Sequence, residues 1–193
     1  LYGPMIQASD MAQLMMSVIE TYHETDHVDA KQPSSSKDLD GLIAAKGWVD
    51  VVQWHLEDAI RAPELAGDAV IALKRRIDAC NQQRTDAVEA IDALLQSTLQ
   101  PIESTAWDIS TRTETLGWAL DRLCILQLKR YHMTIEVKRG SVDQSQLDAL
   151  HAQYHELIAA MDQLIEDLAT GKVSYTLYKQ YKLYNDPSTN PSL

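Results

Sequence analysis

The stretch LDALHAQYHELIAAMDQLIEDL, residues 147–168, has large apolar side chains at alternating intervals of three and four residues. This spacing places them along one side of an α-helix, where they can pack into the face of a neighbouring helix. Residues 70–94 repeat the pattern, although Arg84 interrupts it at a position that should face the core. Two long helices that each need a partner predict a helical bundle.

The rest of the chain continues the helical period, so the sequence predicts an all-α, antiparallel bundle of about five main helices. Residues 1–193 should form a single domain. Residues 1–8 are an N-terminal lead, residues 27–36 are a loop, and residues 172–193 are a C-terminal tail. The main helices are expected at residues 9–26, 36–62, 65–97, 111–140 and 143–171.

Residues that favour helix ends support these boundaries. Thr111 with Glu114 three residues later fits a capping box for the fourth helix. Glycines end the fourth and fifth helices, because only glycine adopts the left-handed backbone of a helix end without strain. The other expected caps are Ser9, Ser36 or Asp38, and Asp143 at helix starts, and Gly140 and Gly171 at helix ends.

The C-terminal tail should contain a short Tyr-rich helical segment followed by an irregular end. Tyr175, Tyr178, Tyr181 and Tyr184 recur every three residues, which would place them on one side of a short helix. Such a large amphipathic surface is seldom left in water. We therefore expect the tail to dock on the bundle or on a partner subunit. In the second case the protein would be a homo-oligomer.

The composition limits the partners and the compartment of the protein. Its 17 basic and 28 acidic residues give a net charge of −11, which disfavours nucleic acid or a membrane surface as a partner. The longest apolar runs are too short to span a membrane. Cys80 and Cys124 are too few for a disulfide framework, so we expect them to be small core residues in a reducing, cytoplasmic setting.

Arg84 should be buried and paired, because a guanidinium in an apolar stripe needs an anionic partner. Asp86 is only two residues away and cannot serve easily. Asp121 should lie at nearly the same height on the fourth helix, and we predict that it is the partner.

Several titratable side chains should meet at one end of the bundle. Each tight turn between antiparallel helices acts as a mirror for height, at about 1.5 Å per residue. This reflection places His55, Asp58, Asp78, His132 and His151 within about two turns of each other. The same end of this acidic protein collects the basic residues Arg61, Lys74, Arg75, Arg76, Lys129, Arg130, Lys138 and Arg139.

The first functional hypothesis is a binding protein, or an enzyme, whose site at this end takes a small phosphorylated or otherwise anionic ligand. His55 and His132 would be proton-transfer candidates, with Asp58 or Asp78 orienting one of them. The ligand-binding candidates are Arg61, Lys74, Arg75 and Lys129.

Two alternatives stay open. One is a structural or interaction bundle without catalytic activity, in which the polar residues tie helices together. The other is a mononuclear metal site built from His55, Asp58 and His132. His23 and His27 also have ligand spacing, but they lie where the first helix should fray. No cofactor is evident, because neither a nucleophile arrangement nor a phosphate-binding or dinucleotide-binding motif is readable.

Five polar motifs, in the same order, resemble a bacterial family of proteins that is catalogued as domain of unknown function 4254. The motifs are YHETD (22–26), VQWHLEDAIRAP (52–63), LKRRIDACNQQRTDAVEAID (73–92), LKRYHM (128–133) and KLYNDP (182–187). The resemblance implies a helical bundle of about this length in a bacterial cytoplasm, and it implies no activity. Ala59 departs from the larger aliphatic residue expected there, which affects packing only. The family's polar positions fall on His23, His55, Glu57, Asp58, Arg61, Lys74, Arg75, Asp78, Asn81, Arg84, Asp86, Glu89 and His132.

Overall fold

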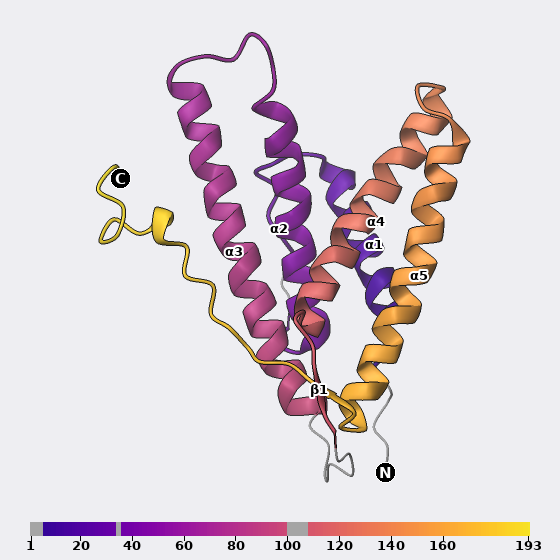
Figure 1. The fold of residues 1–193 in the computed structure, drawn as a ribbon. Helices are drawn as coiled ribbons and strands as arrows, with labels where there is room; N and C mark the ends of the chain where they lie inside the picture. Colours follow the sequence, from indigo (N-terminus) through magenta and orange to yellow (C-terminus); the bar gives the residue numbers. More distant parts are fainter. Residues whose placement is uncertain (1–5, 34–35, 100–107) are drawn as a thin grey trace.

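A computed structural model describes residues 6–33, 36–99 and 108–193, in which five long helices pack against one another (Figure 1). The predicted all-α bundle is therefore confirmed. Parts of the expected lead, loop and connector, at residues 1–5, 34–35 and 100–107, lie outside the described residues. The helices are α1 (Ala8–Thr25), α2 (Leu39–Ala59), α3 (Asp68–Leu99), α4 (Leu116–Arg139) and α5 (Gln144–Ala169).

The bundle consists of two helical hairpins and one further helix. Figure 1 shows the α2–α3 hairpin and the α4–α5 hairpin diverging from each other, with α1 behind them. Helix α1 packs on α2, α4 and α5, and so joins the two hairpins. The main apolar core includes Met15 of α1, Leu120 and Leu123 of α4, and Met161 of α5, all almost fully buried. This arrangement brings the C-terminal end of α1 between α2 and α4.

Most of the expected helix ends are observed. The Asp38 carboxylate accepts the Gly41 N–H at 2.9 Å, and Gly140 ends α4 with φ 76°. Gly171 also has a positive φ, 71°, after α5. Ser9 is not a cap, because α1 begins one residue earlier and the Ala8 N–H donates to a carboxylate of α5 instead. A tertiary contact therefore replaces the local cap at this end.

Helix α4 begins at Leu116, so the predicted capping box of Thr111 and Glu114 is wrong. Ser110–Thr111 instead forms the short strand β1, which pairs in parallel with β2 (Val173–Ser174). Thr115 caps the helix, and its hydroxyl accepts the Trp118 N–H at 3.1 Å. The chain before α4 is thus held by a segment more than sixty residues away.

A buried carboxylate of α3 fixes the start of α4. Asp92 accepts the Thr115 hydroxyl at 2.6 Å and the Gly117 N–H at 2.7 Å. A Cβ atom on Gly117 would lie 2.6 Å from this carboxylate, which explains why the position is a glycine. Asp92 itself is 4% exposed, because the start of α4 covers this side of α3.

The tail does not form the expected helix of tyrosines. Its only helical turn in the described chain is the 3₁₀ turn η1 (Leu183–Asn185), because the pairing of β2 leads the chain away in an extended form. Figure 1 shows the tail running along α3. The Gln180 N–H donates to Glu89 at 2.7 Å, and Lys182 donates to the Asn81 carbonyl at 3.0 Å. Tyr175 packs against the core, but Tyr178 and Tyr181 are largely exposed.

Among the helices that the structure describes, none combines the length and the apolar character needed to cross a membrane.

Candidate metal centre

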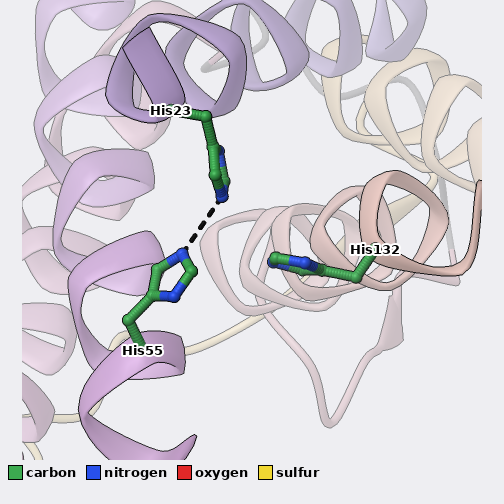
Figure 2. Close-up of side chains that lie close together, drawn as sticks. All are labelled: His23, His55 and His132. Carbon is green, nitrogen blue, oxygen red and sulfur yellow. Dashed lines mark hydrogen bonds between the residues drawn. The ribbon is translucent and has the colours of Figure 1, made fainter. Parts of the chain in front are cut away.

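Three histidines from three helices meet at one point of the bundle (Figure 2). His23 lies in the last turn of α1, His55 near the end of α2, and His132 in the second half of α4. One ring nitrogen of each lies within 4.8 Å of the others, and the Nε2 atoms of His23 and His55 are 3.1 Å apart. All three side chains are partly buried.

The packing of α1, α2 and α4 sets the positions of these rings. Ile19, Val51 and Leu128, one from each helix, form a buried apolar cluster beneath them. An aromatic ring also stacks on each histidine. The stacked pairs are Tyr22 on His55, with centroids 5.2 Å apart, Tyr131 on His23, at 4.4 Å, and Trp54 on His132, at 4.8 Å. Such packing limits ring rotation, so the site is arranged before any ligand binds.

The hydrogen bonds indicate which ring nitrogens carry a proton. The Nδ1 atom of His23 lies 2.6 Å from the Ile19 carbonyl, which can only accept a proton, so Nδ1 is the protonated nitrogen. The lone pair of His23 is then on Nε2, which accepts a hydrogen bond of 3.1 Å from Nε2 of His55, and a metal ion bound between them would replace this hydrogen bond. The Nε2 atom of His132 is buried and has no hydrogen-bond partner among the described residues. Outer hydrogen bonds of this kind orient histidine ligands in metal proteins.

The environment keeps His55 and His132 neutral. Burial, and then the neighbouring His23 and His55, lower the pKa of His132 from 6.5 to about 4. Burial and His23 also lower the pKa of His55, although Asp26 and Asp58 act in the opposite direction. Neutral imidazole is the form that binds a metal ion, so both rings already have the charge state that metal binding requires at neutral pH.

Lowering the pH from about 7 to about 5 should destabilise the fold by about 2 kcal/mol through His132. Its folded pKa of about 4 lies below the ordinary 6.5, so the unfolded chain takes up the proton first. The stability from neutral His132 is complete above about pH 6.5, and it is lost as the pH falls toward 4. Urea denaturation at both pH values measures it. A His132→Phe variant should lose this part of the pH dependence, and an unchanged dependence would assign it to other groups.

The spacing of the nitrogens suits a transition metal ion. Two nitrogens bound to one tetrahedral zinc ion at about 2.0 Å lie about 3.3 Å apart. The separation of 3.1 Å between the Nε2 atoms of His23 and His55 is close to this value. Imidazole suits zinc, copper, iron and nickel, whereas magnesium and calcium prefer oxygen ligands.

The structure brings together only part of the expected cluster. His55 and His132 meet, but Asp78 binds Lys74 one turn away on its own helix. The His151 ring nitrogen accepts a hydrogen bond of 3.0 Å from Arg130, so His151 is held away from the cluster. The heights of these residues along the bundle were therefore not enough to predict which of them meet, because height does not specify which side of each helix a residue occupies.

Part of the expected cationic end is paired with acids. Arg61 binds Glu57 at 3.0 Å, and Lys74 binds Asp78, each within its own helix. Arg75 is exposed on α3. Ion pairs between residues four apart form readily on helices, so the number of basic residues at this end overstates its free positive charge.

Asp58 faces a pocket rather than the histidines. This pocket, about 300 Å³ in volume, is also lined by Trp54, whose ring stacks on His132. Lys129 lines a larger groove of about 960 Å³, formed by residues of α3, α4, α5 and the tail. The residues around the smaller pocket are Asp50, Gln53, Trp54, Glu57, Asp58, Arg61 and Ile125.

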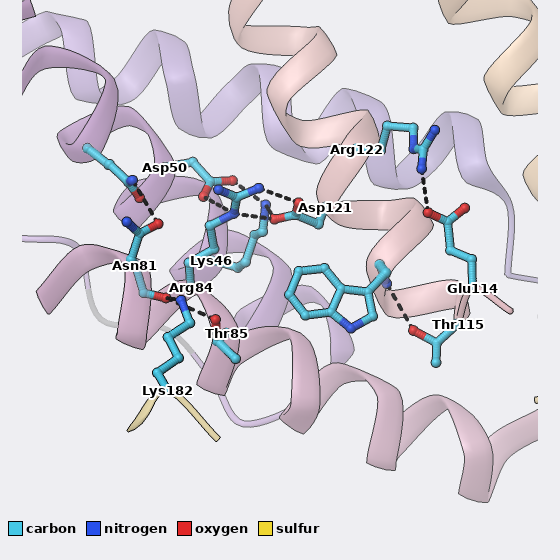
Figure 3. Close-up of polar contacts among 12 residues, drawn as sticks. Lys46, Asp50, Asn81, Arg84, Thr85, Glu114, Thr115, Asp121, Arg122 and Lys182 are labelled. Carbon is cyan, nitrogen blue, oxygen red and sulfur yellow. Dashed lines mark hydrogen bonds and ion pairs between the residues drawn. The ribbon is translucent and has the colours of Figure 1, made fainter. Parts of the chain in front are cut away.

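A buried ion network lies under both cavities (Figure 3). Arg84 binds Asp121 through two hydrogen bonds, the Nε bond being 2.6 Å, which confirms the predicted pair. Lys46, fully buried, contacts both Asp50 and Asp121. Burial alone would lower the pKa of Lys46, but nearby anions, Asp50 and Asp121 among them, raise it above its usual range. The network therefore contains two cations and two carboxylates.

Sequence reasoning missed His23 as a member of the cluster. It had the right spacing with His27, but its place at a helix end suggested fraying. The available signal was the YHETD motif, in which His23 is one of the polar positions of the resembled family. His27 is instead exposed, and its ring accepts the Asp29 N–H.

Comparison with known proteins gives a family but no described function. A family described as "Protein of unknown function (DUF4254)" matches residues 40–176. This range includes His55 and His132, and it begins after His23. No curated protein and no solved structure matches the chain.

Proposed function

We propose, starting from a chain that belongs to the DUF4254 family of proteins of unknown function, that His23, His55 and His132 bind a divalent transition metal ion. The family match covers most of the chain and confirms the resemblance predicted from its motifs. The observation that supports metal binding is the convergence of three ring nitrogens, one of them buried without a partner in the described chain. His23 takes the place in the ligand set that the sequence had suggested for Asp58.

The metal would connect three helices at the end where the hairpins diverge. Each ligand comes from a different helix, so binding would favour the folded state by mass action. Zinc is the first candidate, because it accepts neutral imidazole ligands in a tetrahedral arrangement. The pairing of Arg61 and Lys74 with acids supports a metal over an anionic ligand, since it leaves fewer free cations to bind an anion.

Thermal denaturation of the metal-free protein tests this proposal. Zinc at about 100 times its dissociation constant should add about 2.7 kcal/mol of stability. For a domain of this size that should raise the melting temperature by about 5 to 10 °C. Cobalt and nickel should also stabilise the protein, while magnesium should have little effect.

Matched variants show where the metal binds. His55→Ala should abolish the zinc-dependent shift, because it removes a ligand from the centre of the cluster. His155→Ala is the control, since His155 is an exposed residue of α5 far from this group. The proposal fails if no transition metal raises the melting temperature, or if His55→Ala keeps the full shift. The three rings would then be packing groups, as in the structural alternative.

We also propose a bacterial, cytoplasmic setting. The free, buried thiols of Cys80 and Cys124 support a reducing compartment. Assembly into a homo-oligomer stays a prediction, supported by the exposed rings of Tyr178 and Tyr181 on the tail.

A further inference from the structure

We infer that Asp26 is the fourth ligand of the proposed metal and closes the centre into a three-histidine, one-carboxylate site. The inference rests on the proposed function, because it adds a ligand to the same metal. A site with four protein ligands would be a structural cross-link of α1, α2 and α4, since structural zinc sites have all four positions filled by the protein.

The Asp26 carboxylate lies close to His55. An oxygen of the Asp26 carboxylate lies 3.9 Å from Nε2 of His55, which is also the atom nearest to His23. Two ligand atoms on one tetrahedral zinc ion lie about 3.3 Å apart. The Asp26 carboxylate is close to His55 but does not belong to the group of converging ring nitrogens, so its side chain must turn toward them to bind the ion. Its side chain is 63% exposed, which leaves the carboxylate room for this movement.

The backbone at Asp26 has an unusual conformation. The residue ends α1 in the left-handed region, with φ 52° and ψ 49°, and it is the only non-glycine residue with a positive φ in the described chain. Glycine or asparagine is the usual residue at such a helix end. An aspartate therefore costs stability here, and strained positions of this kind concentrate at functional sites.

The loop that begins at Asp26 is held by a hydrogen bond to α1 and by contacts with α3. The Asp26 N–H donates to the Tyr22 carbonyl at 2.9 Å, which ties the residue to α1. Arg76 of α3 binds the Asp29 carboxylate at 2.9 Å and the Val28 carbonyl at 3.1 Å. The backbone at Asp26 is thus held next to the histidines, and only its side chain needs to turn.

The charge of the bound ion also favours a carboxylate ligand. Three neutral imidazoles leave both positive charges of a divalent ion uncompensated in a partly buried site, and one carboxylate would reduce that charge. Asp58 is the other acid close enough to influence the pKa values of His55 and His132. However, Asp58 lines the pocket that Trp54 also lines, and it forms no ion pair with a histidine among the described residues. Asp26 is therefore the better placed carboxylate.

Zinc competition titrations on the full chain compare the two acids. Asp26→Asn keeps the size of the side chain and a residue type that tolerates the left-handed backbone, but it removes the negative charge. It should weaken zinc binding by at least about tenfold. Asp58→Asn is the matched control and should change the affinity by less than about twofold. Equal affinities for wild type and Asp26→Asn, or a larger loss for Asp58→Asn, would overturn the inference.

Two further measurements separate a ligand from a residue that only shapes the loop. Asp26→Gly should raise the melting temperature of the metal-free protein, because it relieves the backbone, and should still weaken zinc binding. Cobalt bound to the wild type should give the intense visible absorption of a four-coordinate ion, and this spectrum should change in Asp26→Asn. Tight zinc binding by Asp26→Gly, or identical cobalt spectra, would refute a fourth ligand. A wild type that binds no metal would instead refute the proposed function itself.

Discussion

Replacing Lys46 with methionine should lower the free energy of unfolding by about 3 to 5 kcal/mol. The Lys46 ammonium is completely buried and contacts Asp50, and it lies 2.7 Å from an oxygen of Asp121. Methionine fills a similar volume but leaves these two carboxylates with Arg84 as the only cation of the network. An uncompensated charge in the interior is far more costly than the loss of a contact. Urea denaturation at neutral pH measures the change.

A double variant separates charge from packing. Combining Lys46→Met with Asp50→Asn leaves Arg84 paired with Asp121 and restores a neutral network. It should recover a large part of the stability that the single variant loses. Recovery is the signature of a charge imbalance, since a packing defect at Lys46 would persist in the double variant. A single variant within about 1 kcal/mol of wild type would show that water reaches this site.

Replacing Arg84 with alanine should cost about 3 kcal/mol. Arg84 makes two hydrogen bonds to Asp121, and another oxygen, that of Asp50, lies 3.8 Å from its Nε atom. Its side chain is 27% exposed, so some water can replace the guanidinium, and the effect should be smaller than that of Lys46. Chemical denaturation of the variant gives the value directly.

The same groove supplies a matched control for Arg84. Arg122 binds Glu114 at 2.6 Å, the length of the Arg84 Nε bond, but this pair is more exposed, at 66% for Arg122 and 42% for Glu114. Arg122→Ala should change stability by less than about 1 kcal/mol, because water screens exposed ion pairs. If the two alanine variants cost the same, burial would not be the reason why the Arg84 pair matters.

Local pattern was enough to predict the helices and the pairing of Arg84, although Arg84 is half-buried rather than buried as expected. The three-and-four spacing of residues 147–168 defines one apolar side of α5, and it requires no knowledge of the partner helix. The interruption at Arg84 predicted its pairing with Asp121, because a charge in an apolar stripe has few other solutions. Gly140 and Asp38 likewise act through neighbours within a few residues.

Contacts between segments far apart in the sequence decided where α4 begins and which path the tail follows. The start of α4 depends on Asp92 of α3, and the course of the tail depends on the pairing of β1 with β2. Neither contact has a periodic signature, so local rules placed a cap at Thr111 and a helix in the tail.

The candidate metal centre also depends partly on local pattern and partly on contacts between distant segments. The sequence by itself determined that His55 and His132 lie on helices and at similar heights, because rise per residue is fixed by the hydrogen bonds of an α-helix. Only the tertiary structure decided that His23 joins them and that Asp78 and His151 do not. The physical reason is that the rotation of each helix about its axis follows from side-chain packing between helices. That packing turns the last turn of α1 toward α2 and α4, and so places a third imidazole beside the other two.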